Sequence, residues 1–294
     1  MQSLNEYLDV LGWTLDKHSK ATISKNIPAL TNTFMNALDL RSHAQYKQAS
    51  PTQLKSTEDK INEVVLKMIY KLNDAAFRPI FSSLMEWSAK GNVARQQSVY
   101  GFLFAFFDGL KSIVTSYATY VIDGAVKILG ATDPKDQEQI ELWRRVLHTL
   151  RKCFEHDQDG FWQAPAHFGA VAPVLVEQFR HAPVVALDLS HEELIPAVVE
   201  LANAADSQEH QKELNGALLK HLRSESAGVR LAVVLCEQAL TDRLGEDWLG
   251  MLPEMLPYIS ELQDDDDEVV ERETHRWIVK IEGILGESLD SMLQ

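Results

Sequence analysis

Three short segments contain residue types that bind metals, but none of them completes a ligand set. Residues 191–195 (His-Glu-Glu-Leu-Ile) begin like the zinc-protease pattern H-E-x-x-H, yet isoleucine stands where the second histidine is required. Residues 157–160 (Asp-Gln-Asp-Gly) resemble part of a calcium loop, but Ala166 occupies the place of the bidentate glutamate. Cys153 and His156 have ligand-like spacing without a second pair nearby. We therefore expect no metal site, and an Asp-Gly turn at 157–160.

Catalytic signatures are also missing from the sequence. It contains no Walker-A glycine loop, no G-x-G-x-x-G and no G-x-S-x-G, and no nucleophile–base pair can be assembled from it. We therefore predict a protein that is not an enzyme, with no catalytic residue, no cofactor and no small-molecule substrate. The two cysteines, Cys153 and Cys236, lie in apolar helical runs, which favours core positions in a reducing nuclear or cytosolic compartment.

One predicted helix concentrates positive charge on the face opposite its apolar residues. Its apolar face holds Trp143, Val146, Leu147, Leu150 and Phe154, and its basic stripe holds Arg144, Arg145, His148, Arg151 and Lys152. Such a stripe can contact RNA phosphates or an acidic partner. It can equally be a solvated face that nearby acids such as Glu138 and Glu141 balance.

An acidic run lies near the end of the chain. Residues 261–273 contain eight acids against Arg272. The run can receive a basic partner, or it can be a solvated turn that discourages further stacking of repeats. The candidate contacts are Asp264, Asp265, Asp266, Asp267 and Glu268.

Charge is distributed unevenly along the 294 residues, whose net charge is −15. Residues 1–130 hold 14 Lys+Arg and 11 Asp+Glu, whereas residues 131–294 hold 14 and 32. The acidic part favours basic protein partners. It argues against general nucleic-acid binding by that part, because phosphate affinity comes from Lys and Arg contacts.

The elements that must position these residues are helices. Apolar residues recur at helical spacing in nearly every long segment, as between residues 61 and 72 after a start signal at 56–59, and no alternating strand run appears. The clearest breaks between helices lie at residues 47–55, 130–136, 156–165 and 187–192. We therefore predict an all-α fold.

Two segments near the end of the chain repeat each other. Residues 224–230 resemble residues 264–270 forty positions later, and each segment leads into a run that ends in Leu-Gly-Glu, at 244–246 and 285–287. A period near forty with two helices per unit predicts an α-solenoid of HEAT/armadillo-like helical pairs. We expect one domain over residues 1–294, with irregular, near-neutral repeats in 1–130 and more regular, acidic repeats in 131–294.

The repeated turn also predicts specific contacts. Ser226 or Asp267 can cap the second helix of its pair. Val229 and Val269 should then face the core, and Arg230 should reach an acid in a neighbouring repeat. Val270, at the equivalent place in the final unit, cannot make that contact.

Prolines fall where stacked helices tolerate them. Pro28, Pro79, Pro165, Pro196 and Pro253 are expected in or near first turns, where the missing N–H does no harm. Pro173 and Pro257 are expected further inside their helices, which they would kink.

No segment suggests a membrane protein. The most apolar stretch, residues 99–110, is too short to span a bilayer, and no signal peptide is visible after Met1. We therefore expect no membrane partner.

Several motifs together resemble one protein family. Residues 76–81 (Ala-Phe-Arg-Pro-Ile-Phe), followed by Glu86-Trp87, look like the F-R-P-x-F…E-W motif of the U3 small nucleolar RNA-associated protein 10 family. The similarity continues through Tyr100-Gly101-Phe102, Asp159-Gly160-Phe161 and Leu252-Pro253-Glu254 to the acidic turn and the final Leu-Gly-Glu. It runs from about residue 60 to the end of the chain.

The resemblance implies a function as well as a fold. It implies that the chain is the C-terminal region of a much larger HEAT-repeat subunit of the small-subunit processome, with Met1 as an expression start. Such a subunit is nucleolar, and it joins the early U three-protein subcomplex on pre-ribosomal RNA. It supports processing toward 18S RNA and is linked to RNA polymerase I transcription. The family has no catalytic residue to transfer, and Arg78 and Trp87 are expected to be structural.

Two other interpretations remain open at the level of sequence. A HEAT-type transport or phosphatase adaptor would bind basic peptides, although the six tryptophans do not recur at a fixed repeat position. Direct RNA binding would use the basic stripe between Arg144 and Lys152.

Overall fold

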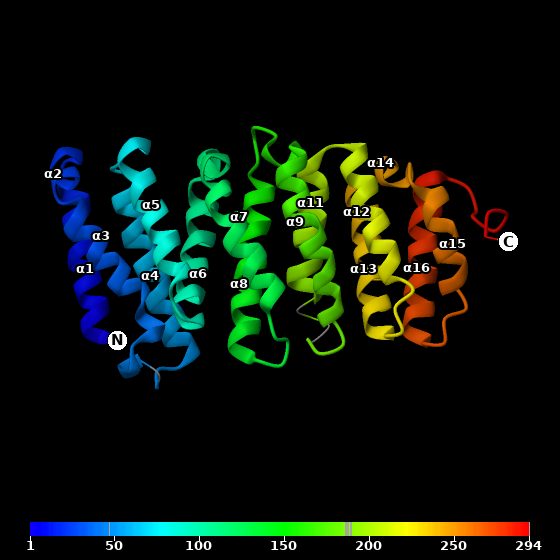
Figure 1. Cartoon of the computed structure of the whole chain (residues 1–294), viewed down its shortest axis with the longest axis horizontal. Coiled ribbons are helices and arrows are strands. Elements are labelled where there is room, and N and C mark those ends of the chain that lie inside the picture. The colour runs from blue at the N-terminus through cyan, green and yellow to red at the C-terminus, as the bar shows by residue number, and fades with distance from the viewer. Residues whose placement is uncertain (47, 186–187, 189, 294) are drawn as a thin grey trace. The chain divides into compact units, whose positions relative to one another are not determined.

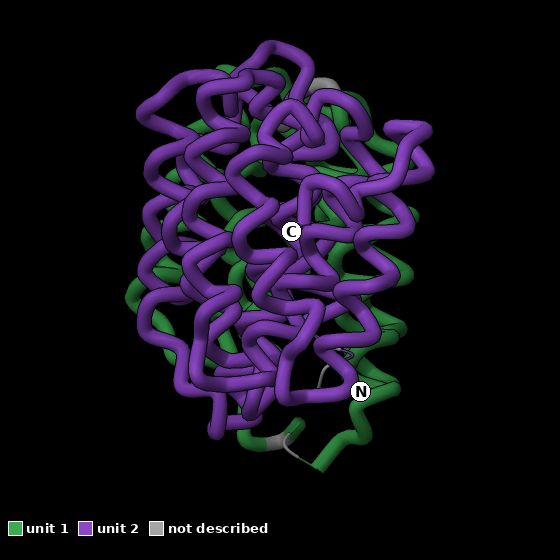
Figure 2. The backbone as a smooth tube through the Cα atoms, turned by 90° about the vertical axis from the view of Figure 1, so that its right-hand side faces the viewer, with its two compact units in different colours: residues 1–111 green, residues 112–294 purple. Residues whose placement is uncertain are grey.

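The computed structural model describes residues 1–46, 48–185, 188 and 190–293 (Figure 1). All regular elements in these ranges are helical, which confirms the prediction of an all-α fold. The chain divides into two compact units, residues 1–111 and 112–294 (Figure 2). The prediction of one continuous repeat domain, changing character at residue 130, stays a prediction. No helix in the described ranges is both long and apolar enough to cross a membrane.

In the first unit, helices pack as two layers of neighbours. Helices α1, α4 and α6 pack side by side in that order, while α3 packs on α4 and α6, and α5 packs on α6. Their bounds are α1 Gln2–Lys17, α2 Lys20–Lys25, α3 Ile27–Leu38, α4 Pro51–Ile69, α5 Asp74–Ala89 and α6 Val93–Gly109, with short turns η1 Leu40–Ser42 and η2 Ala44–Tyr46.

The second unit is a more regular stack of helical pairs. Helices α8, α11, α13 and α16 form one succession, and α7, α9, α12 and α15 form the other. Successive pairs bury their apolar faces on each other, which is the arrangement expected of a HEAT/armadillo-like solenoid. The helices are α7 Val114–Ala131, α8 Gln137–Glu155, α9 Pro165–Glu177, α11 Ile195–Ala205, α12 Gln208–His221, α13 Ala227–Leu244, α14 Glu246–Leu249, α15 Leu252–Leu262 and α16 Glu268–Leu285. Short helical turns are η3 Lys111–Ile113, η4 Phe161–Gln163, η5 Gln178–His181 and the π-helical η6 Ser190–Leu194.

The repeat in the second unit has a period of forty-one residues, one more than the turn sequences suggested. Helices α13 and α16 begin forty-one positions apart, and each ends at a glycine with positive φ, Gly245 at 57° and Gly286 at 75°. In this register Val229 corresponds to Val270, and both are buried. The prediction that Val269 faces the core was wrong, because its side chain is 38% exposed.

The two predicted caps differ. The Asp267 carboxylate accepts hydrogen bonds from the backbone N–H groups of Val269 and Val270, at 2.9 and 3.1 Å. Ser226 makes no side-chain cap bond to α13, so that prediction was wrong. Instead, its backbone N–H donates to Ser224 Oγ at 3.2 Å.

Two further expectations about helix boundaries need correction. Helix α4 begins at Pro51 rather than after 56–59, because Ser50 and Gln53 form a reciprocal capping box. Pro79 lies inside α5 rather than in its first turn. The other six of the seven prolines with a predicted position lie where expected: four at the starts of α3, α9, α11 and α15, and Pro173 and Pro257 inside their helices. Residues 187 and 189 of the predicted break at 187–192 lie outside the described residues.

The difference between the two caps gives a stability test. We expect Asp267→Ala to lower the free energy of unfolding by about 1 kcal/mol, because two backbone donors lose their acceptor. Ser226→Ala at the equivalent position serves as the matched control and should change it by less than about 0.5 kcal/mol. Urea denaturation of both variants measures the difference. Equal losses would contradict the assigned capping.

A buried acid in the second unit makes stability depend on pH. Glu237 on α13 is fully buried, and its Oε2 accepts a hydrogen bond from Trp248 Nε1 at 2.9 Å. Burial raises the pKa of Glu237 from its usual 4.5 to about 8, against the opposing effect of the Trp248 bond. The folded protein therefore keeps a proton that the unfolded chain loses as the pH rises.

We expect the free energy of unfolding to fall between about pH 5 and pH 8 because of Glu237. Glu237→Gln keeps an acceptor for Trp248 and should remove this part of the pH dependence. Glu254→Gln is the control, because Glu254 is exposed enough to ionise freely and its hydrogen bond from Lys212 lowers its pKa. The free energy of unfolding, obtained from denaturation curves at several pH values in this range, should depend less on pH in Glu237→Gln than in wild type. Glu254→Gln should keep the pH dependence of wild type. A parallel slope in wild type and Glu237→Gln would refute the assignment.

Candidate interaction surfaces

The basic stripe is assembled on α8 as the sequence predicts. Asp136 caps this helix, accepting from the backbone N–H of Glu138 at 2.9 Å and of Gln139 at 3.3 Å. The apolar side is buried, and Trp143 Nε1 donates to Gln178 Oε1 at 3.0 Å. The cap and this buried bond hold the helix so that its basic residues lie on the other side.

A buried acid pairs with two residues of the stripe. Glu193, in the π-helical turn η6, is only 3% exposed. Arg144 Nε donates to its Oε1 at 2.8 Å, and His148 Nε2 pairs with its Oε2. A buried carboxylate needs such partners because an unpaired charge is costly to bury. Sequence reasoning missed Glu193, which lies forty-nine residues from Arg144 and carries no local signal.

Acids on α8 itself balance two more residues. Arg145 Nε donates to Glu141 Oε1 at 2.7 Å, and Lys152 Nζ donates to Glu155 Oε2 at 2.9 Å. The Nε of Arg151 is buried and has no hydrogen-bond partner among the described residues. The stripe is therefore largely neutralised from within the unit. Its contact with RNA or an acidic partner stays a prediction.

The acidic turn is partly used inside the fold. The Asp265 carboxylate accepts a bidentate pair from Arg230, with Nε–Oδ2 at 2.8 Å and Nη2–Oδ1 at 2.7 Å. This confirms that Arg230 reaches an acid of a neighbouring pair. Burial acts to raise the pKa of Asp265, but the Arg230 hydrogen bond, the backbone N–H of Asp267 and the positive charge of Arg230 together outweigh it and hold that pKa below its usual value. Because Asp267 caps α16, the acids left for a basic partner are the exposed Asp264, Asp266 and Glu268.

Several motif residues that carry the family resemblance make contacts within the fold, while a purely structural role for Arg78 and Trp87 stays a prediction. Phe77 and Phe81 are buried, with ring centroids 5.8 Å apart, and Arg78 pairs with Asp74 one turn earlier at 2.9 Å. The guanidinium of Arg95 stacks on the Trp87 ring at 4.2 Å.

The segments weighed as metal sites have structural roles. Asp157 accepts from the backbone N–H groups of Asp159 and Phe161, each at 3.2 Å, and Gly160 has φ 67°. The prediction of an Asp-Gly turn is confirmed. Burial raises the pKa of the Cys153 thiol well above its usual value. Within the described residues, no group of three His, Cys, Asp or Glu side chains could hold a metal ion.

The Arg230–Asp265 pair can be compared with an exposed pair in the same unit. Arg223 Nε donates to Glu261 Oε2 at 2.8 Å, but both side chains are more than half exposed. In double-mutant cycles with alanine we expect a coupling of about 1.5–3 kcal/mol for Arg230–Asp265, because it is charge-assisted and shielded from water. The exposed pair should give about 0.2–1 kcal/mol. Urea denaturation measures both, and equal coupling would refute the structural role of Asp265.

Comparison with known proteins identifies the sequence family. The BP28CT (NUC211) domain model matches residues 22–162. Proteins named U3 small nucleolar RNA-associated protein 10 are 64% identical in Chaetomium globosum and in Neurospora crassa, and 58% identical in Pyricularia oryzae. Each alignment covers 99% of this chain and 17% of the relative. The chain thus spans less than a fifth of the length of these relatives.

A designed armadillo repeat protein aligns with 85% of this chain and 98% of its own, at 16% identity and a TM-score of 0.44. The stacked helical pairs of the second unit show the fold class by themselves. Along nearly its whole length, the chain belongs to the U3 small nucleolar RNA-associated protein 10 family.

Proposed function

We propose that this chain is a non-catalytic helical scaffold region that acts in ribosome biogenesis. The observation that carries the proposal is its similarity, over 99% of its length, to proteins named for association with U3 small nucleolar RNA. In this role the chain serves the small-subunit processome in the nucleolus and supports maturation of pre-18S RNA. The link to RNA polymerase I transcription belongs to the same proposal.

Stacked helical pairs suit this role because they present extended surface. The partners are processome proteins, in particular those of the early U three-protein subcomplex. Electrostatic matching gives such contacts specificity and speed. The exposed acids Asp264, Asp266 and Glu268 suit a basic protein segment. Contact with pre-ribosomal RNA through the α8 stripe is the secondary route, since ion pairs inside the unit already balance most of that stripe.

Affinity purification of this chain from nuclear extract, with and without RNase, tests the proposal. We expect processome subunits to be recovered and to persist after RNase, because the contacts are between proteins. Loss of these subunits after RNase treatment would indicate that RNA mediates the contact. Recovery of import factors or phosphatase subunits instead would refute the proposal in favour of an adaptor that binds basic peptides.

The RNA route can be isolated with variants that leave the fold intact. Replacing Arg144 would remove one of the two partners of the buried Glu193 and disturb the fold, so the informative substitutions are Arg151→Gln with Lys152→Gln. We expect this double variant to recover the same partners as wild type. The control is Lys212→Gln, which removes an exposed lysine paired with Glu254. RNA contact at α8 would be established if this variant alone showed a weaker salt dependence of RNA binding. The slope of the logarithm of the binding constant against the logarithm of the salt concentration should fall by about one unit per lost contact.

A further inference from the structure

The ion pairs between Glu193 and the basic stripe of α8 are unequal in burial. The Glu193 side chain is 3% exposed, and it holds Arg144 Nε at 2.8 Å through Oε1 and His148 Nε2 through Oε2. The two partners on α8 are far more open, since their side chains are 45% and 31% exposed. The acid therefore lies inside the unit, whereas the groups that it holds reach the surface.

The turn that carries Glu193 has an uncommon winding. η6 is a π-helix that leads directly into α11, and it also packs on α8, α13 and η5. Such helices account for less than about 1% of residues in soluble proteins, and single π turns occur frequently at functional sites. A change from π to α winding redirects the side chains of the turn. It therefore gives Glu193 a route away from the stripe.

The stripe presents its donors at intervals that suit a flexible chain of phosphates. Arg144, His148 and Arg151 follow one another at four and three residues, so each lies about 5 Å further along the helix. The Nε of Arg151 has no hydrogen-bond partner among the described residues. Arginine binds phosphate oxygens through paired N–H donors, and phosphate contacts supply most of the affinity for RNA. A single strand of RNA can place successive phosphates on these turns.

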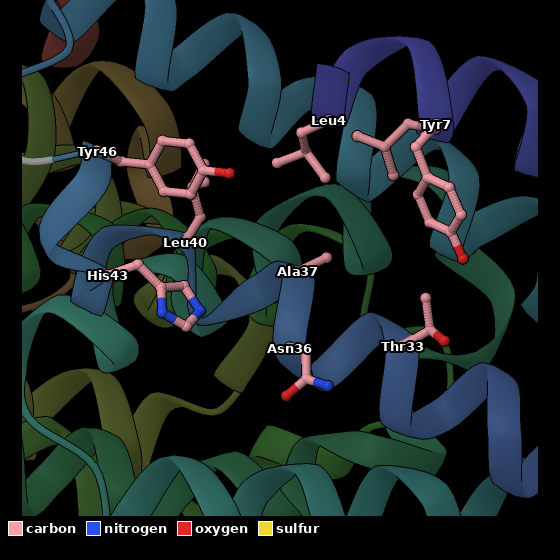
Figure 3. Close-up of a pocket in the computed structure, with 9 residues that line it drawn as sticks. Leu4, Tyr7, Thr33, Asn36, Ala37, Leu40, His43 and Tyr46 are labelled. Atoms are coloured by element: carbon pink, nitrogen blue, oxygen red, sulfur yellow. The ribbon is translucent and has the colours of Figure 1, made fainter. Parts of the chain in front are cut away.

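A hollow of about 270 Å³ in the first unit lacks the chemistry for such a ligand (Figure 3). It lies between α1, α3 and the turns η1 and η2, and Tyr7, His43 and Tyr46 are among the residues around it. None of its nine lining residues is Lys, Arg, Asp or Glu. Because phosphate affinity comes from Lys and Arg contacts, an RNA backbone gains more at α8 than in this hollow.

We propose that Glu193 is an internal competitor of RNA at the α8 stripe. Its carboxylate holds the Arg144 and His148 groups that would otherwise bind phosphates of a single-stranded RNA. RNA gains these two contacts only when Glu193 is displaced, and displacement leaves a buried carboxylate without its partners, which is costly. The wild-type chain is therefore held in a state of weak RNA binding. The inference rests on the RNA route of the proposed function and adds the residue that regulates it.

Binding of a fluorescently labelled oligo-uridine RNA to the full chain tests the proposal. We expect Glu193→Gln to bind about fivefold more tightly than wild type at low salt. The slope of the logarithm of the binding constant against the logarithm of the salt concentration should steepen by about 0.7 per released contact. Glutamine still offers Arg144 an acceptor, and the groups that lose their charged partner are open to water, so the variant should keep its fold.

Glu192→Gln is the matched control for this variant. Glu192 is the exposed neighbour of Glu193 in η6, so its replacement changes the net charge equally without removing an ion pair of the stripe. It should change RNA affinity by less than about twofold, because exposed charges are screened by salt. Equal affinities of the two variants would overturn the proposal.

Arg144→Gln in the Glu193→Gln background identifies the released group. Without the buried carboxylate, the loss of Arg144 leaves no buried charge unpaired. We expect RNA affinity to return to about the wild-type value. A gain that persists in this double variant would overturn the assignment of Arg144. Stronger binding of an oligo-glutamate peptide than of RNA to Glu193→Gln would overturn RNA as the ligand.

Hydrogen exchange of the wild-type chain keeps the test independent of the folding of any variant. Saturating oligo-uridine should speed amide exchange in η6, since Glu193 loses its anchor there, and should leave exchange in α13 unchanged. Unchanged exchange in η6 would contradict displacement of Glu193. These measurements contain only the chain and RNA, so they can fail while processome subunits are still recovered in the purification described above, and the reverse.

Discussion

The stacking of the second unit depends on giving every buried indole N–H an acceptor. Four tryptophans of this unit are fully buried, and a buried N–H without a partner is costly. Trp143 donates to Gln178 and Trp162 to the Cys153 carbonyl, while Trp248 donates to Glu237 and Trp277 to Thr241. Each bond joins two elements that apolar contact alone would allow to slide. The large tryptophan rings bury apolar surface, and their single N–H donors fix how the paired elements are aligned.

The need for an acceptor explains why polar side chains occur in the buried interfaces between helices. Thr241 accepts from Trp277 and itself donates to the Glu237 carbonyl at 2.7 Å. Gln238 Nε2 donates to the Glu273 carbonyl at 2.8 Å on the adjacent helix α16. Glu237 is the extreme case, because it satisfies Trp248 while its own burial favours the protonated form. The carboxyl group of Glu237 helps to fix the register as an indole acceptor, but it makes the fold less stable as the pH rises from about 5 to about 8.

Much of the fold was predictable because it depends on local patterns. Helical periodicity identified the elements, and the Leu-Gly-Glu ends marked the repeat, since a helix that ends in a positive-φ residue favours glycine. The turn sequences alone gave a period of forty, because Val269 and Val229 align as letters while Val270 and Val229 align in space. Ser226 and Asp267 both match a cap by residue type, yet only Asp267 acts as one.

The candidate surfaces were less predictable because their chemistry is set by distant residues. The α8 stripe was visible in the sequence, but the acid that neutralises Arg144 and His148 comes from η6. Charge counts describe what a unit carries, whereas its surface presents only the charges that the fold leaves unpaired.

The internal use of charge also narrows what can bind the two units. In the second unit, Glu193 and Asp265 pair with arginines inside the fold, so these acids are withdrawn from the surface while the surplus of acids over bases is unchanged. In the first unit, Arg41 likewise pairs with Glu58 at 2.6 Å and Arg95 with Asp39 at 3.0 Å. A basic segment is attracted to the acids of the α15–α16 turn, where long-range attraction speeds association. The charge that a partner meets therefore depends on which acids the fold leaves exposed, such as Asp264, Asp266 and Glu268, and not on the composition alone.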